Sequence, residues 1–400
     1  MTAPRTATKY TAIGTITVAF LWIVLASQFE GFINRVDPAI LPAISPHARA
    51  LHETSLVVDL HSDSLLFGRN LLKRSDLGHV DLPRLIEGGA GLQVFSLPTI
   101  VPFGLNIESN ERPGIDAITI GGLAQLSRAA WLSPLERALY RARQLHDYAR
   151  ASKGQLVLIK DQAGLQKLLA ARAQGAGTIG ALLAIEGAHA MEGDPANLQR
   201  LYDAGYRMIG LTHFFDNRYA GSAHGVHKGG LTKLGRNTIV AMEKLGVIVD
   251  LAHVSPIAIE EILALVTRPT VVSHTGVRGT CDNRRNLSDE HIRQIAAGGG
   301  VIGIGYWETA VCGRAPADIA AAIGHVVRLV GADHAALGSD YDGGTTVGFD
   351  TSQLRALTQA LIEEGLDDGA VRKVLGENVL RLFRATLPGA TRGHARTKAN

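Results

Sequence analysis

The sequence predicts an α/β fold, a (β/α)8 barrel of the TIM type with helical elaborations, preceded by an N-terminal hydrophobic helix. One observation is that a short apolar run, typical of a parallel strand buried on both faces, recurs eight times and alternates with helical stretches. The other is that six of these runs are followed at once by a histidine or a carboxylate. The alternation favours a closed parallel barrel over an open sheet. The runs are Leu56–Leu60, Gly91–Leu97, Ile179–Ile185, Tyr206–Thr212, Val247–Ala252, Thr270–Ser273, Val301–Tyr306 and Ala335–Ser339.

The helical stretches between the runs carry recognisable start signals. Asp81 stands in the N-cap position before a proline in the first turn, and Ser288 precedes an acidic first turn. Two segments are too long for simple crossovers, Pro98–Gly180 and the Gly- and His-rich Phe214–Gly235. We interpret both as elaborations of the barrel, the first largely helical around residues 131–153.

Residues 1–30 read as a signal anchor or transmembrane segment. Arg5 and Lys9 precede Thr11–Ser27, seventeen residues without a charge. A cationic start followed by an apolar run is typical of an export signal or an uncleaved anchor, and extension to Phe29 gives about the 20 residues that a bilayer requires. A buried core helix is the alternative, but core helices rarely open a chain behind two cations. The remaining chain is therefore expected outside the cytoplasm, on the periplasmic or extracellular side, or secreted if the segment is cleaved.

The remainder divides into a barrel at 31–386 and a tail at 387–400 that is predicted to be disordered. The chain has 400 residues, of which 46% are hydrophobic and 19% charged, so it can bury a large core. The net charge is only +3, and no Lys/Arg stripe interleaved with aromatic residues occurs. These features argue against nucleic acid as a partner.

The polar residues at the strand ends are the strongest functional signal. In a parallel barrel the C-terminal ends of all strands meet at one mouth, where such barrels carry out their chemistry. A single buried histidine is usually a satisfied core residue, but so many ionisable groups buried at one mouth need metal or mutual hydrogen bonds. The residues that follow the runs are His61, Asp63, Glu186, His213, His253, His274 and Asp340.

This residue set suits zinc, because His and carboxylate ligands without thiolate leave a coordination position for water. His61 and Asp63 leave their strand on the same side and can reach one ion. His253 and His274 come from adjacent strands and could hold a second, with Glu186 as a bridge. Two ions about 3.5–4 Å apart would share a hydroxide nucleophile and polarise the scissile carbonyl.

Seven motifs resemble one known family, the membrane (renal) dipeptidases of the amidohydrolase superfamily, in a bacterial branch. The resemblance runs from about Val57 to Phe383. The motifs are DLHSD (59–63), GHVDLPRLIEGGAGLQVFS (78–96), AIEGAH (184–189), LTH (211–213), GGLTKLGRNTIVAMEKLGVIVDLAHVS (229–255), VVSHTGVRGTCDNRRNLSD (271–289) and GSDYDG (338–343).

The resemblance implies a zinc-dependent dipeptidase with two Zn²⁺ per chain. His61 and Asp63 would bind one zinc, His253 and His274 the other, and Glu186 would bridge them. By the same resemblance His213 would contact the substrate carbonyl or the tetrahedral intermediate, and Arg285 would grip the substrate's C-terminal carboxylate. Asp340, rather than Asp342, would carry the proton from the bridging water to the leaving amine.

Two cysteines occur, Cys281 and Cys312, and neither lies in a CxxC motif. In an exported chain the two cysteines could form one disulfide. The resemblance favours this bond because the family often has a cysteine at position 281.

The substrate is less constrained than the metal site. Ser62 stands where the family commonly has Asn, and the segment PFGLNIESN (102–110) is unlike the animal enzymes. An alternative keeps the metals but acts on a lactam, a lactone or an N-acyl amino acid, and another is a membrane-tethered binding protein with a dead barrel. The sequence leaves open which dipeptides are cleaved, whether the native metal is zinc, and whether two copies form a homodimer.

Several other polar residues receive structural interpretations. Asp59 and Asp250 are interpreted as hydrogen-bond partners near the strand ends, and His189 as a residue that could orient a ligand. His224 and His227 are expected in a solvated loop. The histidines expected at the surface or at helix ends are His52, His79, His146, His291, His325 and His334.

Overall fold

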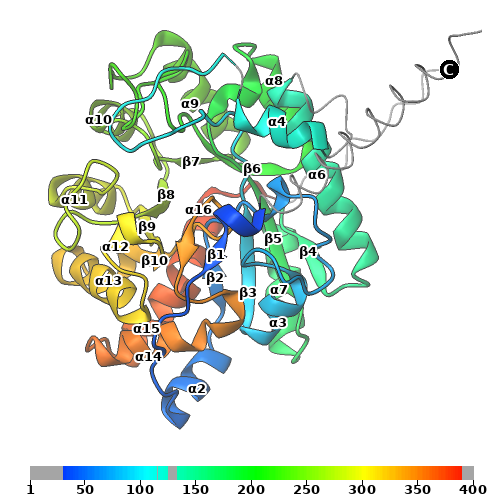
Figure 1. The fold of residues 1–400 in the computed structure, drawn as a ribbon, viewed down its shortest axis with the longest axis vertical. Coiled ribbons are helices and arrows are strands. Elements are labelled where there is room, and N and C mark those ends of the chain that lie inside the picture. The colour runs from blue at the N-terminus through cyan, green and yellow to red at the C-terminus, as the bar shows by residue number, and fades with distance from the viewer. Residues whose placement is uncertain (1–29, 115, 125–132, 390–400) are drawn as a thin grey trace, which may run out of the picture.

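The computed structural model describes residues 30–114, 116–124 and 133–389 (Figure 1). The predicted hydrophobic helix and all but the first three residues of the predicted tail lie outside the described residues. Within them, no helix combines the length and the apolar character needed to cross a membrane. Leu387 is buried, and the Pro388 carbonyl accepts a hydrogen bond from the Gln162 amide at 3.0 Å, so the first two tail residues pack on the barrel.

A closed barrel of eight parallel strands confirms the predicted fold (Figure 1). Each strand pairs with its neighbour in chain order, β3 pairs directly with β5, and β10 pairs with β2 to close the ring. The barrel strands are β2 (Val57–Asp59), β3 (Ala90–Phe95), β5 (Ile179–Ile185), β6 (Tyr206–Gly210), β7 (Ile248–Asp250), β8 (Val271–Thr275), β9 (Val301–Ile304) and β10 (Ala335–Leu337).

A ninth strand, β4 (Leu156–Leu158), corrects the interpretation of the segment between β3 and β5. It pairs in parallel with the first half of β5, with Leu156 opposite Ile179. Three residues are too few for a periodic signal, and this strand follows directly on a long helix, α6 (Pro134–Ala151). A second small sheet pairs β1 (Arg35–Val36) with β11 (Thr346–Val347).

Helices surround the barrel and begin where the capping signals indicate. The Asp81 carboxylate accepts a hydrogen bond from the Arg84 amide at the start of α3 (Leu82–Glu87), and Ser288 caps α11 (Asp289–Ala297). The other helices are α2 (Pro46–Glu53), α4 (Ala117–Ala124), α7 (Gln162–Ala173), α8 (Ala196–Ala204), α9 (Lys233–Leu245), α10 (Pro256–Leu263), α12 (Glu308–Val311), α13 (Pro316–Val330), α14 (Arg355–Glu363), α15 (Asp368–Arg372) and α16 (Asn378–Thr386).

The core fills the barrel and leaves its C-terminal mouth for polar residues. One cluster of buried side chains joins strand residues such as Leu92 and Met208 to Phe383 of α16. A larger cluster packs the opposite faces of the strands against the surrounding helices. Because apolar side chains occupy the interior, the ionisable groups after the strands gather at one end.

His52 lies in the last turn of α2, one of the two positions predicted for it, but its side chain is buried and makes stability depend on pH. Its Nδ1 lies 2.7 Å from Thr358 Oγ1 and its Nε2 lies 2.8 Å from the Gly88 carbonyl. Burial lowers the pKa of His52 to about 4, although the Gly88 carbonyl acts in the opposite direction.

The unfolded chain therefore takes up this proton near pH 6.5, and the folded chain only near pH 4. We expect burial of His52 to lower the free energy of unfolding by up to about 3 kcal/mol as the pH falls from 6.5 to 4. Below pH 4 this residue causes no further change. Urea unfolding of wild type and His52→Gln at pH 7 and pH 4.5 measures this difference. His47→Gln, at an exposed position of the same helix, is the control. An equal pH dependence in wild type and His52→Gln would contradict the assignment.

Candidate metal centre

The structure brings all seven strand-end residues to the barrel mouth. His61 and Asp63 follow β2, Glu186 follows β5, and His274 lies within β8. His213, His253 and Asp340 follow β6, β7 and β10 in the same way. Six of the seven are buried, and Asp340 has a side chain that is 13% exposed.

Glu186 lies at the centre of this group, between a first half that contains His253 and His274 and a second half that contains His61. One of its carboxylate oxygens faces each half. Its Oε1 lies 2.9 Å from His253 Nε2 and 3.3 Å from His274 Nε2. Its Oε2 lies 3.4 Å from His213 Nε2 and 3.9 Å from His61 Nε2. The Glu186 side chain can therefore share a cation with donors on both sides.

The second half of the centre surrounds His61. Its Nε2 lies 3.4 Å from Asp63 Oδ1 and 3.8 Å from Asp340 Oδ1. Three sets of three donors each lie close enough to hold a metal ion. The sets are His61, Glu186 and His274; Glu186, His213 and His253; and His61, Asp63 and Asp340.

The buried atoms of the centre fit metal ions chemically. His61 Nε2, Asp63 Oδ1 and Glu186 Oε1 are buried without a hydrogen-bond partner. Leaving a buried polar atom unsatisfied costs about 1–3 kcal/mol, and more for a charged group, so three such atoms in adjoining donor sets favour bound cations. Imidazole and carboxylate donors without thiolate match hydrolytic zinc sites.

A layer of hydrogen bonds behind the centre orients the donors. Ser273 Oγ lies 3.3 Å from His61 Nδ1 and 2.9 Å from His274 Nδ1, so one hydroxyl contacts both rings. Asp59 accepts hydrogen bonds from the His61 amide and from Ser339, and Asp250 accepts one from the Ser273 amide. This is the supporting role expected of Asp59 and Asp250.

Three of the seven described non-glycine residues with positive φ lie at the barrel mouth. His253, Asp340 and Asp342 have φ values of 61°, 60° and 63°, in the left-handed region that side chains other than glycine rarely adopt. Such strain concentrates at functional sites, where the surrounding structure holds it.

The ionisable side chains of the centre lie so close together that they shift one another's pKa values. Burial would lower the pKa of His61, but the Glu186 and Asp63 carboxylates raise it to about 10. Burial, together with Asp63, raises the pKa of Asp340 to about 7 against the opposing effect of His61. Burial and the positive charge of Arg285 lower the pKa of His253, so this imidazole is neutral and available as a ligand.

Arg285 is buried beside the centre. Its Nη2 donates to the His274 carbonyl at 2.8 Å, and its guanidinium carbon lies 5.5 Å from the Trp307 ring centroid. Asp340 and Arg285 line the same cavity of about 1040 Å³ as Glu186 and His213. A guanidinium in this position can bind a carboxylate that lies over the centre.

Asp342 has a different environment from Asp340. It is fully buried, and its carboxylate accepts hydrogen bonds from Ser64 Oγ at 2.5 Å, from the His79 amide at 2.6 Å and from Arg69. His79 is also buried and lies outside a helix, which corrects its expected position at the surface or at a helix end. Both aspartates line the cavity, but the Asp342 oxygens are engaged by the protein and fix the loop, whereas the Asp340 side chain is partly exposed.

The prediction of a solvated loop is wrong for His224. This side chain is buried, its Nδ1 lies 2.9 Å from the Ile107 carbonyl, and its ring centroid lies 5.2 Å from that of His253. Asp216 folds the loop by accepting hydrogen bonds from the amides of Ser222 and His227. His227 itself is exposed, as predicted.

His189 lies outside the donor sets. Its Nδ1 is 3.2 Å from Thr99 Oγ1 and its Nε2 is 3.3 Å from Asn217 Nδ2, so its ring contacts neighbouring loops and none of the predicted metal ligands.

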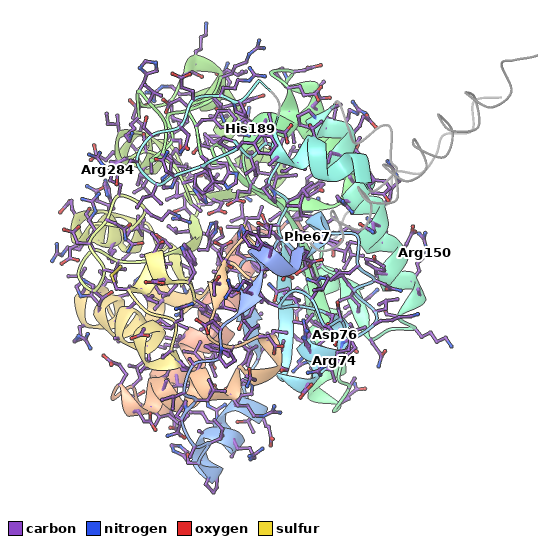
Figure 2. All side chains as sticks on the ribbon, viewed as in Figure 1. Phe67, Arg74, Asp76, Arg150, His189 and Arg284 are labelled. Atoms are coloured by element: carbon purple, nitrogen blue, oxygen red, sulfur yellow. A yellow bond between two sulfur atoms is a disulfide. The ribbon has the colours of Figure 1, made fainter. Side chains whose placement is uncertain are left out.

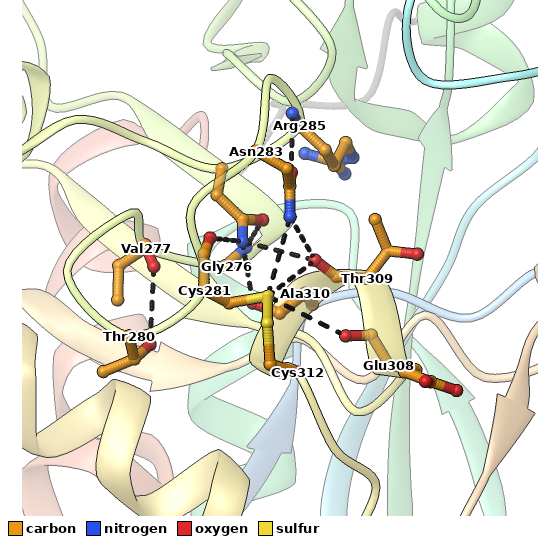
Figure 3. Close-up of a disulfide and its surroundings, with 11 residues drawn as sticks. Gly276, Val277, Thr280, Cys281, Asn283, Arg285, Glu308, Thr309, Ala310 and Cys312 are labelled. Atoms are coloured by element: carbon orange, nitrogen blue, oxygen red, sulfur yellow. Dashed lines mark hydrogen bonds between the residues drawn. A yellow bond between two sulfur atoms is a disulfide. The ribbon is translucent and has the colours of Figure 1, made fainter.

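Cys281 and Cys312 form a disulfide that joins the two ends of the segment containing Arg285 (Figure 3). The Arg285 amide donates to Asn283 Oδ1 at 2.9 Å, and Asn283 Nδ2 donates to the Thr309 carbonyl at 2.8 Å. These bonds tie the Arg285 loop to the segment around α12, so the guanidinium is held by a fixed backbone.

A TIM barrel with histidines and carboxylates converging on its C-terminal mouth is typical of metal-dependent hydrolases. The sequence profile of the membrane dipeptidase family (peptidase family M19) matches residues 46–395. The chain belongs to this family.

Individual relatives agree with this assignment. Over 214 residues the chain is 32% identical to the dipeptidase verJ of Clonostachys rogersoniana, a stretch that covers 52% of this chain and 55% of that relative. A metallopeptidase from Rhodobacter sphaeroides, solved with a phosphinate mimic of the dipeptide L-Ala-D-Ala, superposes with a TM-score of 0.70 at 24% identity, covering 83% of this chain and 99% of that one. The probable dipeptidase PvdM from Pseudomonas aeruginosa gives 0.70 at 22% identity, covering 85% and 98%. At these identities the two structures establish the fold.

Proposed function

We propose that the protein is a dipeptidase that holds two zinc ions and hydrolyses the peptide bond of dipeptides. The convergence of donors on Glu186 carries this proposal. His61 and Asp63 would hold one ion, His253 and His274 the other, and Glu186 both. The distances from Glu186 to histidines on both sides support a shared ligand.

Zinc held by these residues would supply Lewis acidity and would activate a water molecule as the nucleophile. Arg285 binds the substrate's free carboxylate through its guanidinium fork. His213 faces the same centre and contacts the carbonyl of the scissile bond. Asp340 accepts the proton released by the attacking water at Oδ1 or Oδ2 and returns it to the leaving amine.

A substrate panel tests this function on the purified full chain loaded with zinc. We expect cleavage of dipeptides with a free carboxylate and little cleavage of the same dipeptides as C-terminal amides, because amides lack the group that Arg285 binds. A related amidohydrolase acting on a lactam, a lactone or an N-acyl amino acid is the second candidate, favoured by a cavity larger than a small dipeptide fills. Turnover of those compounds alone would replace the first proposal by the second.

Replacing Arg285 by lysine is expected to lower kcat/KM for a dipeptide by about 10- to 100-fold, mainly through KM, since one bidentate charged contact is lost. The activity on the amidated dipeptide should barely change. Arg284→Lys is the matched control, because this neighbouring arginine, labelled at the edge of the molecule in Figure 2, is exposed. It pairs with Glu108. An unchanged KM in Arg285→Lys would exclude the carboxylate contact.

We further propose that residues 1–30 attach the protein to a membrane with the catalytic domain outside the cytoplasm, or direct its secretion if they are cleaved. The uncharged run Thr11–Ser27 and the Cys281–Cys312 disulfide support this, because disulfides persist in oxidising compartments. Protease treatment of intact cells tests it. Digestion or release of the catalytic domain is expected in intact cells if it lies at the cell exterior, and after removal of the outer envelope if it is periplasmic. Protection until the cytoplasmic membrane is opened would contradict the proposal.

A further inference from the structure

The cavity over the metal centre extends well beyond the donors. Its volume of about 1040 Å³ is at the upper end of the roughly 300–1,000 Å³ typical of sites for drug-sized ligands. A dipeptide with two small side chains would leave much of this space unfilled. The cavity walls away from the metal donors therefore influence which substrates bind.

The order of strands places two of these walls opposite each other. Arg285 follows β8, and the segment 98–107 follows β3. Around the closed ring, four steps separate β3 from β8 in either direction, through β2, β10 and β9 or through β5, β6 and β7. With its carboxylate on Arg285 and its scissile bond over the centre, a substrate directs its amino-terminal residue toward the β3 side.

The β3 side is apolar. The residues that form this wall, which we call the apolar wall, are Val101, Pro102, Phe103, Leu105, Ile107 and Ile118. Ile118 is buried, whereas Phe103 is 60% exposed and Leu105 41%, so the wall runs from the interior to the rim of the cavity. Phe67, which is labelled near the centre of the view in Figure 2, also lines the cavity.

The charged groups near the apolar wall are engaged by the protein. Arg137 donates to the Thr99 carbonyl at 2.6 Å and contacts Asp116 at 3.3 Å. Arg141 donates to the Leu66 carbonyl at 2.9 Å and to Gln144 at 2.8 Å. Since these cations have protein partners, the surface offered to a ligand on this side is chiefly hydrocarbon.

Contacts at both ends hold the wall in place. The Ala117 amide donates to the Val101 carbonyl at 2.9 Å, which joins the segment to α4. The His224 ring bonds to the Ile107 carbonyl, and the Asn110 amide donates to the His224 carbonyl at 2.8 Å. A surface formed before the ligand arrives binds with a smaller entropic cost.

From this geometry we infer that the apolar wall binds the side chain of the substrate's amino-terminal residue and selects a large apolar one. This inference rests on the proposed dipeptidase function and names its substrate class. The preferred dipeptides carry Leu, Phe or Trp at the amino-terminal position, with the free carboxylate on Arg285. Burial of such a side chain against hydrocarbon strengthens binding, and a pocket distinguishes methylene groups by their fit.

The test is kcat/KM for the series Gly-Ala, Ala-Ala, Leu-Ala, Phe-Ala and Trp-Ala with the zinc-loaded full chain. We expect a rise of about tenfold or more from Gly-Ala to Phe-Ala. If dipeptides are cleaved but Gly-Ala or Ala-Ala is preferred, this inference fails and the proposed function stands. If no dipeptide is cleaved by protein that holds two metal ions, the proposed function fails and the inference with it.

Substitutions at Phe103 locate the effect, because its exposure lets the fold tolerate them. Phe103→Ala should lower the ratio of Phe-Ala to Gly-Ala activity by about threefold, Phe103→Asp should lower it further, and Phe103→Leu should largely restore it. Ile257→Ala, at an exposed apolar position on α10 away from the cavity, should leave the ratio unchanged. An unchanged ratio in Phe103→Asp would overturn the assignment of this wall.

Discussion

Replacing Glu186 by glutamine is expected to lower kcat/KM for dipeptides by about 10³-fold or more and to release at least one metal ion. Glu186 lies between His253 and His274 on one side and His61 on the other, so its two oxygens serve both halves of the centre. A neutral amide cannot offset the charge of two cations. A metal ion lowers the activation free energy by several kcal/mol, so its loss corresponds to the expected decrease in kcat/KM.

The measurement compares metal content and dipeptide hydrolysis in wild type, Glu186→Gln and Glu290→Gln. Glu290 lies on the exposed side of α11, so its variant should behave as wild type. Circular dichroism establishes that each variant is folded. Full activity in folded Glu186→Gln would sink the proposed chemistry.

Replacing Asp340 by asparagine is expected to lower kcat by about 10²- to 10⁴-fold while KM and the metal content change little. Asp340 is the most exposed carboxylate of the centre, since its side chain is 13% exposed and those of Asp63 and Glu186 are 5% exposed, and its Oδ1 lies 3.8 Å from His61 Nε2. An amide cannot accept the proton of the attacking water. Metal binding should persist because Asp63 and Glu186 remain.

Asp340→Glu is the informative companion, since a carboxylate on a longer side chain should recover part of kcat. Loss of a metal ion from Asp340→Asn would make this residue a ligand and contradict its role in proton transfer. Equal kcat values for the wild type and Asp340→Asn would exclude it from the reaction.

The barrel and the donor set could be predicted because both follow from local patterns. Eight apolar runs define the strands, and a polar residue directly after a parallel strand can lie only at the mouth. His61, Glu186 and His274, far apart in sequence, are therefore brought together by topology alone.

Features that depend on contacts through space could not be predicted. His224 is buried because Asp216 folds its loop, and His52 because α2 packs on Gly88 and Thr358. Neither contact leaves a periodic signal. β4 was missed because a three-residue strand is too short to show a period.

The apolar wall also escaped prediction, although its residues are plain in the sequence. Val101 and Ile107 stand in a loop without periodicity, and only the cyclic order of the strands sets them opposite Arg285. The ring contact between Arg285 and Trp307 arises in the same way, from loops of two neighbouring strands.

The most direct test of the central claim is the metal content of the purified full chain, measured together with dipeptide hydrolysis on the same sample. We expect about two zinc ions per chain, with activity lost to a chelator and restored by zinc. A protein that holds no metal and takes none up would contradict the assignment of the cluster around Glu186.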